Sequence, residues 1–487
     1  MKTWIQLNAS YMQRKALLLC LFTGVFLLLF ARSVSAAENP DTLLSSEIRS
    51  RIDSQALGLY YPQSVKRFYE LTHFDSAWIK SQRETGPTWE AMLMIDCVLQ
   101  FGLSHADYHP DELLYSRLHA ILEQPNKVRL SQKARFDIML TDAMITFINH
   151  LHYGKLNPEY PANRIDAGIS GFSAENILLA GLQQNALAKV MLNVQPQSKE
   201  YADLQNYMHL LKGQYLDDCY EVPEAEVRKV AINMERLKWA AIDEPYYIHI
   251  NIPSYTLKFY QKDSVYQFKV IVGKPGTPTP TLHSAINYFT TAPEWNVPQS
   301  IMVKEVLPRS LRDTNYIGNN HLAIYDLKGN YIQPRIANLK QVKRQPSNYH
   351  IQQSSGCDNS LGVIVFRFDN PFDVYLHDTP EKKLFKETDR AFSHGCIRVE
   401  QAEKLAHLLL KYDNASDKIN IVSHTIAAYQ TKTFVLNRPV PIKITYLTGE
   451  MRNGVFTTYK DIYNLDKSLE MALYNIDLTY TMSIEKQ

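Results

Sequence analysis

Residues 391–400 read AFSHGCIRVE, and residues 375–380 shortly before them read YLHDTP. The first stretch contains a thiol, Cys396, and the second contains a histidine, His377. A thiol attacks a carbonyl group as the thiolate, so it needs a neighbour that takes its proton or a positive charge that stabilises the anion. His377 is a candidate for the first role and Arg398 for the second. The two stretches therefore predict a nucleophilic site without a metal.

The three residues before the cysteine are Ser393, His394 and Gly395. A glycine at this position lets the backbone pass close to a bound carbonyl group. The N–H groups of Gly395 and Cys396 could then stabilise an oxyanion.

This motif, a histidine followed about fifteen residues later by Ser-His-Gly-Cys, an apolar residue and an arginine, resembles the signature of the L,D-transpeptidases. Their catalytic domain is the YkuD type. Three further stretches resemble the large YcbB-like branch of that family: VIVGKPGTPTPTLHSAIN at 270–287, WNVPQS at 295–300 and ITYLTGEMRNGVFTTYKDIYNLD at 444–466. The resemblance covers most of residues 225–470.

The resemblance implies that a peptidoglycan tetrapeptide stem loses its terminal D-alanine to Cys396, and that the acyl group then passes to a diaminopimelate amine of another stem. His377 moves the proton, a backbone carbonyl near Asp378 orients its ring, and His394 has a supporting role. We expect the substrate to meet Arg398, Ser393, Tyr375, Trp295, Asn296 and Asp378. No cofactor and no metal is expected, and the partners are stem peptides and other proteins of cell-wall synthesis.

Four alternatives remain at this point. Water as the acceptor would make the chain an L,D-carboxypeptidase, and a protein lysine would make it an anchoring transferase. The helical N-terminal half also fits a non-catalytic wall-binding scaffold. Zinc bound by His377, His394, Cys357 and Cys396 is disfavoured, because zinc ligands within one arm usually lie two to four residues apart.

Composition limits the protein class. The chain has 487 residues, of which 45% are hydrophobic and 21% charged, as in globular proteins of two domains. Residues 1–36 hold four basic and no acidic residues, so removing them changes the net charge from +2 to −2. The remainder has no excess positive charge to attract nucleic acid.

Those 36 residues have a basic start, an apolar run from Ala16 to Ala31 and small residues at Val34 and Ala36. This pattern is typical of a secretory signal, and an uncleaved membrane anchor is the alternative. Either predicts export to the periplasm, with a tether to the inner membrane in the second case. If Cys396 stays a thiol, Cys97, Cys219 and Cys357 can form at most one disulfide.

The periodicity of apolar residues predicts an α+β protein. A helical scaffold domain is expected over 41–220, with one continuous helix across 174–192, and a mostly antiparallel β domain over 225–487. A polar insertion near 298–360 predicts a lid. After the Cys396 loop we expect a helix with Ala402, Leu405, Ala406 and Leu409 on one side. If Cys396 lies just before the N-terminus of that helix, the helix dipole would also favour the thiolate. We also expect a hairpin that turns at Asn453-Gly454 to complete the sheet. The relatives' peptidoglycan-binding module has no room between the scaffold and the β domain.

Overall fold

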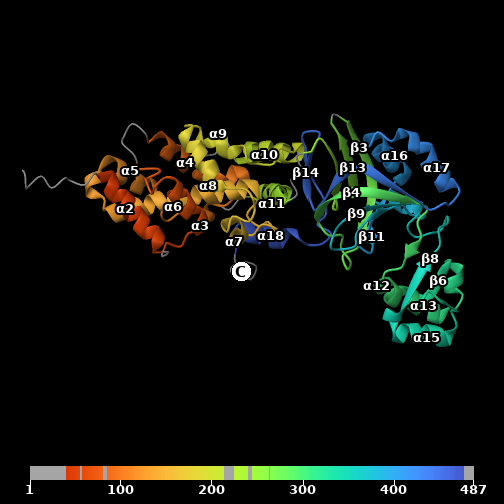
Figure 1. Cartoon of the computed structure of the whole chain (residues 1–487). Helices are drawn as coiled ribbons and strands as arrows, with labels where there is room; N and C mark the ends of the chain where they lie inside the picture. Colours follow the sequence, from red (N-terminus) through yellow and green to blue (C-terminus); the bar gives the residue numbers. More distant parts are fainter. Residues whose placement is uncertain are drawn as a thin grey trace, which may run out of the picture.

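The computed structural model describes residues 40–54, 57–79, 85–212, 224–239, 244–262 and 264–476. A helical scaffold and a β domain lie along one long axis (Figure 1). A smaller subdomain, residues 295–353, projects to one side of the β domain, and we call it the cap. The leader predicted at 1–36 and the cysteine Cys219 lie outside the described residues. Among the residues described, no helix has both the length and the apolar character to cross a membrane.

The scaffold is built around one long helix. Its helices are α2 (Pro40–Asp53), α3 (Pro62–Leu71), α4 (Gly86–Asp96), α5 (Tyr115–Glu123), α6 (Leu130–His152), α7 (Ala162–Asp166), α8 (Ala174–Gln183), α9 (Leu187–Leu192) and α10 (Lys199–Lys212). Helix α6 is buried on all sides from Phe136 to Leu151, so the other helices surround it. The helical scaffold is confirmed.

The scaffold departs from the sequence prediction in one helix. The segment 174–192 is two helices and not one, because Asn185 has φ +50° and ends the helical path between them. Asparagine tolerates this left-handed conformation, and apolar periodicity alone does not reveal it.

The carboxylates inside the scaffold have structural partners. Asp137 of α6 accepts hydrogen bonds from the Tyr69 hydroxyl (2.6 Å) and from the backbone N–H of Trp78 (3.0 Å). His150, near the end of α6, is hydrogen-bonded to Tyr108 at 2.9 Å. The polar groups of α6 thus fix loops around the helix.

The β domain is a sheet closed on itself. Its strands are β1 (Tyr246–Asn251), β2 (Thr256–Gln261), β3 (Ser264–Gly273), β4 (Leu282–Thr291), β9 (Ile364–Phe368), β10 (Leu376–His377), β11 (Ala391–Ser393), β12 (Ile397–Val399) and β13 (Lys432–Thr445). The order in the described residues is β11-β3-β12-β10-β9-β4-β13-β1-β2, and pairing of β2 with β3 closes the ring.

Most neighbours in this sheet are antiparallel, and β1–β13, β10–β12 and β3–β11 are parallel. Helix α16 (Ala402–Tyr412) places Leu405 and Leu409 in the same apolar core as Leu376 and Ile397 of the strands. The predicted α+β class with a mostly antiparallel β domain is confirmed.

The C-terminal hairpin, β14 (Gly449–Arg452) and β15 (Val455–Thr458), turns at Asn453 and Gly454, which have φ +51° and +80°. The turn is therefore where the sequence predicts it, but the hairpin forms its own two-stranded sheet in the described structure. After β13, the N–H groups of Leu447 and Thr448 bond to side chains, those of Asn251 and Asn233, and not to a neighbouring strand. The expectation that it completes the main sheet is wrong.

The hairpin packs against α10 and against α11 (Ala225–Trp239), which also contacts α18 (Asp466–Leu473). Arg236 of α11 is buried and donates to Asp466 of α18 at 2.6 Å. Elements from the middle of the chain and from its C-terminal part thus join the scaffold to the β domain.

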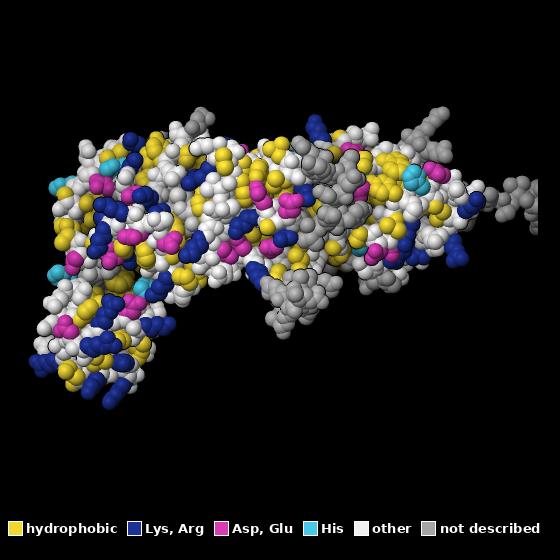
Figure 2. All heavy atoms as spheres, turned by 180° about the vertical axis from the view of Figure 1, so that it is seen from behind, with side chains coloured by type: hydrophobic (Ala, Val, Ile, Leu, Met, Phe, Trp, Pro, Cys, Tyr) yellow, Lys and Arg dark blue, Asp and Glu magenta, His cyan; other side chains and the backbone are white. Residues whose placement is uncertain are grey.

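The cap has its own four-stranded sheet and apolar core. Its strands are β5 (Trp295–Asn296), β6 (Leu322–Asp326), β7 (Tyr331–Ile332) and β8 (Tyr349–Gln353), in the order β5-β8-β6-β7. Its helices are α12 (Gln299–Ile301), the π-helix η6 (Met302–Val306), α13 (Leu307–Arg312), α14 (Tyr316–Asn319) and α15 (Ile336–Arg344). Figure 2 shows Lys and Arg side chains spread over the surface of this cap.

Candidate active site

The register of two short parallel strands brings the predicted residues together. In β10 and β12, Leu376 lies opposite Ile397 and His377 lies opposite Arg398. Leu376 and Ile397 are fully buried in the apolar core. Because side chains alternate along a strand, Tyr375, His377, Cys396 and Arg398 all project from the other face. These four residues form what we call the reactive face.

His377 is held in one tautomer. Its Nδ1–H donates to the backbone carbonyl of Asp378 at 2.6 Å, and a carbonyl can only accept. The Nε2 atom is then the acceptor, as a base for a thiol requires. Burial, followed by the nearby Arg398 charge, lowers the pKa of His377 to about 3, so the ring is neutral at physiological pH.

The carbonyl that orients His377 is itself fixed. The Asp378 carboxylate accepts the Val363 N–H at 3.1 Å and pairs with Lys382. Gly362 lies against it with φ +62°, and a Cβ there would come within 2.5 Å of the Asp378 carboxylate. The sequence also predicts Asp378 as a substrate contact. Its carboxylate is buried and already has partners inside the protein.

Cys396 has the properties of a neutral thiol. Burial raises its pKa, although hydrogen bonds from Tyr375 and the charge of Arg367 act in the opposite direction. The thiol lies 3.9 Å from the Asp373 carbonyl. Cys396 directly precedes the strand β12 (Ile397–Val399), and a turn separates that strand from α16, so the cysteine leads into a strand and not into a helix. The helix predicted after Cys396 is present as α16, but the cysteine does not lie directly before its N-terminus, so the condition for a helix-dipole contribution to its ionisation is not met.

The loop before the cysteine is held by its own hydrogen bonds. Gly395 has φ +121°, a conformation that favours glycine. The buried Ser393 hydroxyl accepts the Gly395 N–H at 3.2 Å and donates to the Cys396 carbonyl at 2.5 Å. The Ser393 hydroxyl, predicted to meet the substrate, is thus already hydrogen-bonded within its own loop. The Gly395 N–H is engaged, which leaves the Cys396 N–H as the oxyanion donor to consider.

Two threonines that the sequence motifs did not indicate hold the same loop. Thr279 donates to the Gly395 carbonyl at 2.7 Å, and Thr277 donates to the Ser393 carbonyl at 3.2 Å. Both belong to the KPGTPT segment after β3, and its density of Pro, Gly and Thr was the available signal of a tight loop.

The cap also contributes residues next to the reactive face. Trp295 of β5 hydrogen-bonds to the Tyr375 hydroxyl, so this predicted pair is brought together. Asn296 is exposed beside it and pairs with Gln352. His394 bonds to Glu305 in the cap's π-helix.

Two arginines flank the reactive face. Arg398 donates to Glu381 at 2.6 Å, while its buried Nε has no hydrogen-bond acceptor among the described residues. Arg367 of β9 lies 4.2 Å above the Tyr375 ring. Arg367 was not among the residues predicted from the sequence, although its alternation with the buried Phe366 and Phe368 places it on this face.

The zinc alternative has no geometric basis in the described residues, where no three His, Cys, Asp or Glu side chains are grouped closely enough to hold a metal ion. Nor do Cys97, Cys357 and Cys396 form a disulfide among themselves.

Comparison with known proteins agrees with this geometry. Residues 245–439 match the model of the L,D-transpeptidase catalytic domain, YkuD, and residues 63–208 match that of a scaffold domain. A protein of Haemophilus influenzae, named as a candidate L,D-transpeptidase, is 32% identical over 253 residues. That region is 52% of this chain and spans half, 50%, of the relative's length.

Proposed function

Since residues 245–439 form a YkuD-type L,D-transpeptidase catalytic domain, we propose that this chain cross-links peptidoglycan through an acyl-enzyme on Cys396. The observation that carries the proposal is the shared face of Cys396 and His377, with His377 Nε2 left as the acceptor. The sequence similarity to the Haemophilus influenzae relative supports the assignment to the L,D-transpeptidase family. The reaction below is our proposal for this chain.

In the first step, Cys396 Sγ bonds to the carbonyl carbon of the stem's diaminopimelate residue while His377 Nε2 takes the thiol proton. The Cys396 N–H donates to the oxyanion. The bond to the terminal D-alanine then breaks, and the leaving amine receives the proton from His377. A thioester remains on the enzyme.

In the second step, a side-chain amine of another stem attacks the thioester. His377 takes the proton of the attacking amine and returns it to the departing sulfur, which restores the thiol. One amide bond has been broken and one formed, so the reaction needs neither an external oxidant nor a nucleotide. Arg398, whose Nε lacks an acceptor in the described structure, is the candidate for binding a stem carboxylate.

The leader at residues 1–36 motivates the proposal that the protein works in the periplasm, either released or anchored. Stem peptides are the proposed partners. No nucleic-acid partner is proposed, because the chain without the leader has a small net negative charge.

The test is a digest of muropeptides after purified protein has been incubated with tetrapeptide stems. We expect new dimers from the wild type and from Cys357→Ser, a control at an exposed cysteine of the cap region, and none from Cys396→Ser. Tripeptides without dimers would identify a carboxypeptidase. No product, together with no adduct of a carbapenem at Cys396, would identify a non-catalytic wall-binding protein.

A further inference from the structure

A polar groove lies where the scaffold meets the β domain. Its volume is about 870 Å³, and it is lined by α10 on one side and by β2, β3 and the β14–β15 turn on the other. Helix α10 and β14 lie next to each other in Figure 1. We call it the junction groove, and the reaction at Cys396 does not use it.

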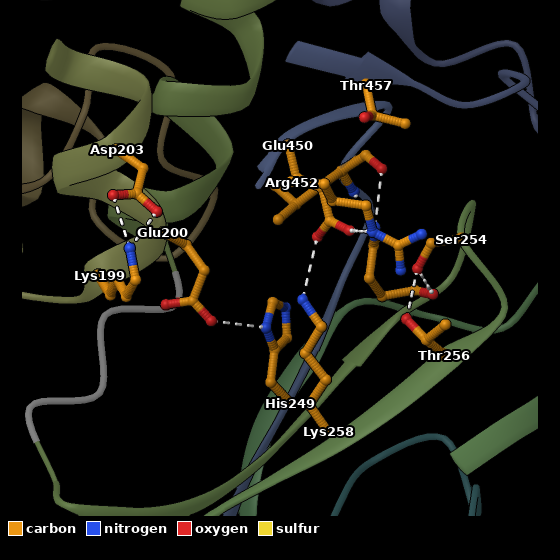
Figure 3. A network of polar contacts seen from close by, with 12 residues as sticks. Lys199, Glu200, Asp203, His249, Ser254, Thr256, Lys258, Glu450, Arg452 and Thr457 are labelled. Atoms are coloured by element: carbon orange, nitrogen blue, oxygen red, sulfur yellow. Dashed lines mark hydrogen bonds and ion pairs between the residues drawn. The ribbon is translucent and has the colours of Figure 1, made fainter. Parts of the chain in front are cut away.

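Two cations that line the groove, Lys258 and Arg452, are bonded to a buried carboxylate. Glu450 of β14 is buried and accepts hydrogen bonds from Lys258 (3.4 Å), Arg452 (2.8 Å) and the Tyr459 hydroxyl (2.6 Å). Figure 3 shows Lys258 and Arg452 converging on this carboxylate from the sheet and from the hairpin. The two cations are thus held in place before any ligand arrives.

The charges of the groove nearly cancel. Lys199 pairs with Asp203 on the α10 side at 2.7 Å, and Lys258 and Arg452 share Glu450. Three cations face two carboxylates, which leaves one net positive charge. A polyanion is bound through several uncompensated cations, so this lining does not fit one.

The uncharged part of the lining fits a sugar chain. Asn206, Gln267 and Asn453 provide amide groups, each of which both donates and accepts hydrogen bonds, as hydroxyl and acetamido groups of a ligand require. Tyr207 lies at the same wall with its ring stacked on Phe456, 5.4 Å between centroids. An aromatic ring braced in this way offers a flat apolar surface for the C–H face of a sugar.

Strand β3 connects the groove to the reactive face. Gln267 pairs with Lys258 in the groove, and Ile271 of the same strand pairs with Arg398. Phe268, Val270 and Val272 are in the core, so Gln267 and Ile271 share the face turned away from it. Four residues at about 3.3 Å each separate the two positions by roughly 13 Å along the strand.

We propose that the junction groove binds the glycan strand of peptidoglycan, so that the attached stem peptide reaches Cys396. The inference rests on the proposed function for its substrate. It adds a second contact with that substrate, made jointly by the scaffold and the β domain.

The experiment measures co-sedimentation of the full chain with insoluble peptidoglycan, in a Cys396→Ala background that prevents turnover. The test variant is Asn206→Ala/Gln267→Ala, and the control is Asn420→Ala on α17 (Ile419–Ala427), an exposed asparagine outside the groove. Asn206 and Gln267 are also exposed, so their replacement should not disturb the core. If the double variant melts at a lower temperature than the control, Asn206→Ala alone replaces it as the test variant.

We expect the test variant to bind roughly tenfold more weakly than the control, the effect of losing two hydrogen bonds. Oligomers of N-acetylglucosamine should compete for binding to the control. Equal binding by the two variants, or competition by free stem peptide but not by the oligomer, would overturn the proposal.

A second assay separates this proposal from the proposed function. With Cys396 present, the Asn206→Ala/Gln267→Ala variant should still cross-link short soluble stems at the wild-type rate, because these lack a glycan strand. If neither the wild type nor the variant forms product from stems, while N-acetylglucosamine oligomers still compete for peptidoglycan binding, then the proposed reaction is wrong and glycan binding in the junction groove is supported.

Discussion

The pair Cys396 and His377 is neutral at rest. Burial raises the pKa of the thiol and lowers that of the imidazole, so the ion pair found in many thiol enzymes is disfavoured before substrate binds. In the proposed reaction, proton transfer then accompanies attack on the carbonyl group. This arrangement protects the sulfur from oxidation, because oxidation follows thiolate character.

A pH profile of alkylation tests the neutral pair. The rate of iodoacetamide reaction at Cys396, followed by mass spectrometry, should rise with pH and still be increasing at about pH 9, since the thiol pKa is raised. Denatured protein provides the reference profile. A rate that reaches its plateau below about pH 7 would mean a stable thiolate, contrary to our account.

The sequence was sufficient to predict Cys396 and His377, because motif spacing and strand alternation are local properties. It was not sufficient for Ser393 and Asp378. Both have the polar groups that a substrate contact needs, but the structure uses those groups inside the protein. A hydrogen-bond partner from another element, such as Val363 for Asp378, is not visible in a local pattern.

The cap is joined to the nucleophile loop through Glu305 and His394. Burial raises the pKa of Glu305, but the hydrogen bond from His394 and the charges of Lys274 and Arg309 outweigh it and lower the pKa overall. Lys274 Nζ also lies 3.5 Å from His394 Nε2. A carboxylate of the cap is therefore stabilised by residues beside Cys396.

Glu305→Ala should loosen this contact. We expect Cys396 to be alkylated faster and the KM for stem peptide to rise about fivefold. A change of this size is no larger than the loss of one hydrogen bond to a charged group. The matched control is Lys304→Ala, the exposed neighbour in the same π-helix. Identical kinetics in the two variants would show that the cap is held by other contacts.

The turn that carries Gly362 supports the carbonyl that orients His377. Gly362→Ala should cost roughly 2 kcal/mol or more of unfolding free energy in urea, since it adds a Cβ at positive φ against Asp378. Gly276→Ala is the control, because a Cβ there meets nothing within 4 Å. Equal stability of both variants would mean that the turn adapts at little cost.

Most elements of the fold follow from periodicity in the sequence. Alternation predicted β1, β2 and β3, and the apolar stripe predicted α16. The C-terminal hairpin shows the limit of such reasoning. Its turn was predictable from Asn453-Gly454, but its docking depends on α10 and α11, far away in the chain.

The whole molecule should lose stability in mild acid. His150 in the scaffold, His249 at the junction and His377 in the β domain are buried, and desolvation is the main cause that lowers the pKa of each. Each therefore binds a proton less readily in the folded protein than in the unfolded chain, where histidine becomes charged below about pH 6.5. The free energy of unfolding therefore decreases as the pH falls below that value.

The expected slope is up to about 1.4 kcal/mol per pH unit for each histidine. Urea unfolding between pH 6.5 and 5 measures it. His150→Gln should reduce the slope, whereas His119→Gln, at a surface position, should not. Stability that is constant over this range would contradict the assigned burial of these rings.

The junction between scaffold and β domain is polar as well as apolar. His249 is hydrogen-bonded to Glu200 of α10 at 3.2 Å and to Thr445 of β13 at 2.8 Å. The scaffold is thus fixed to the sheet that carries the reactive face, which is the condition for the junction groove to act together with Cys396.

The most direct test of the account is the intact mass of the protein after brief incubation with a tetrapeptide stem. We predict an added mass equal to the stem without its terminal D-alanine, located on Cys396 by peptide mapping and absent from Cys396→Ser. Cross-linked product formed by Cys396→Ser, or an adduct on another residue, would contradict it.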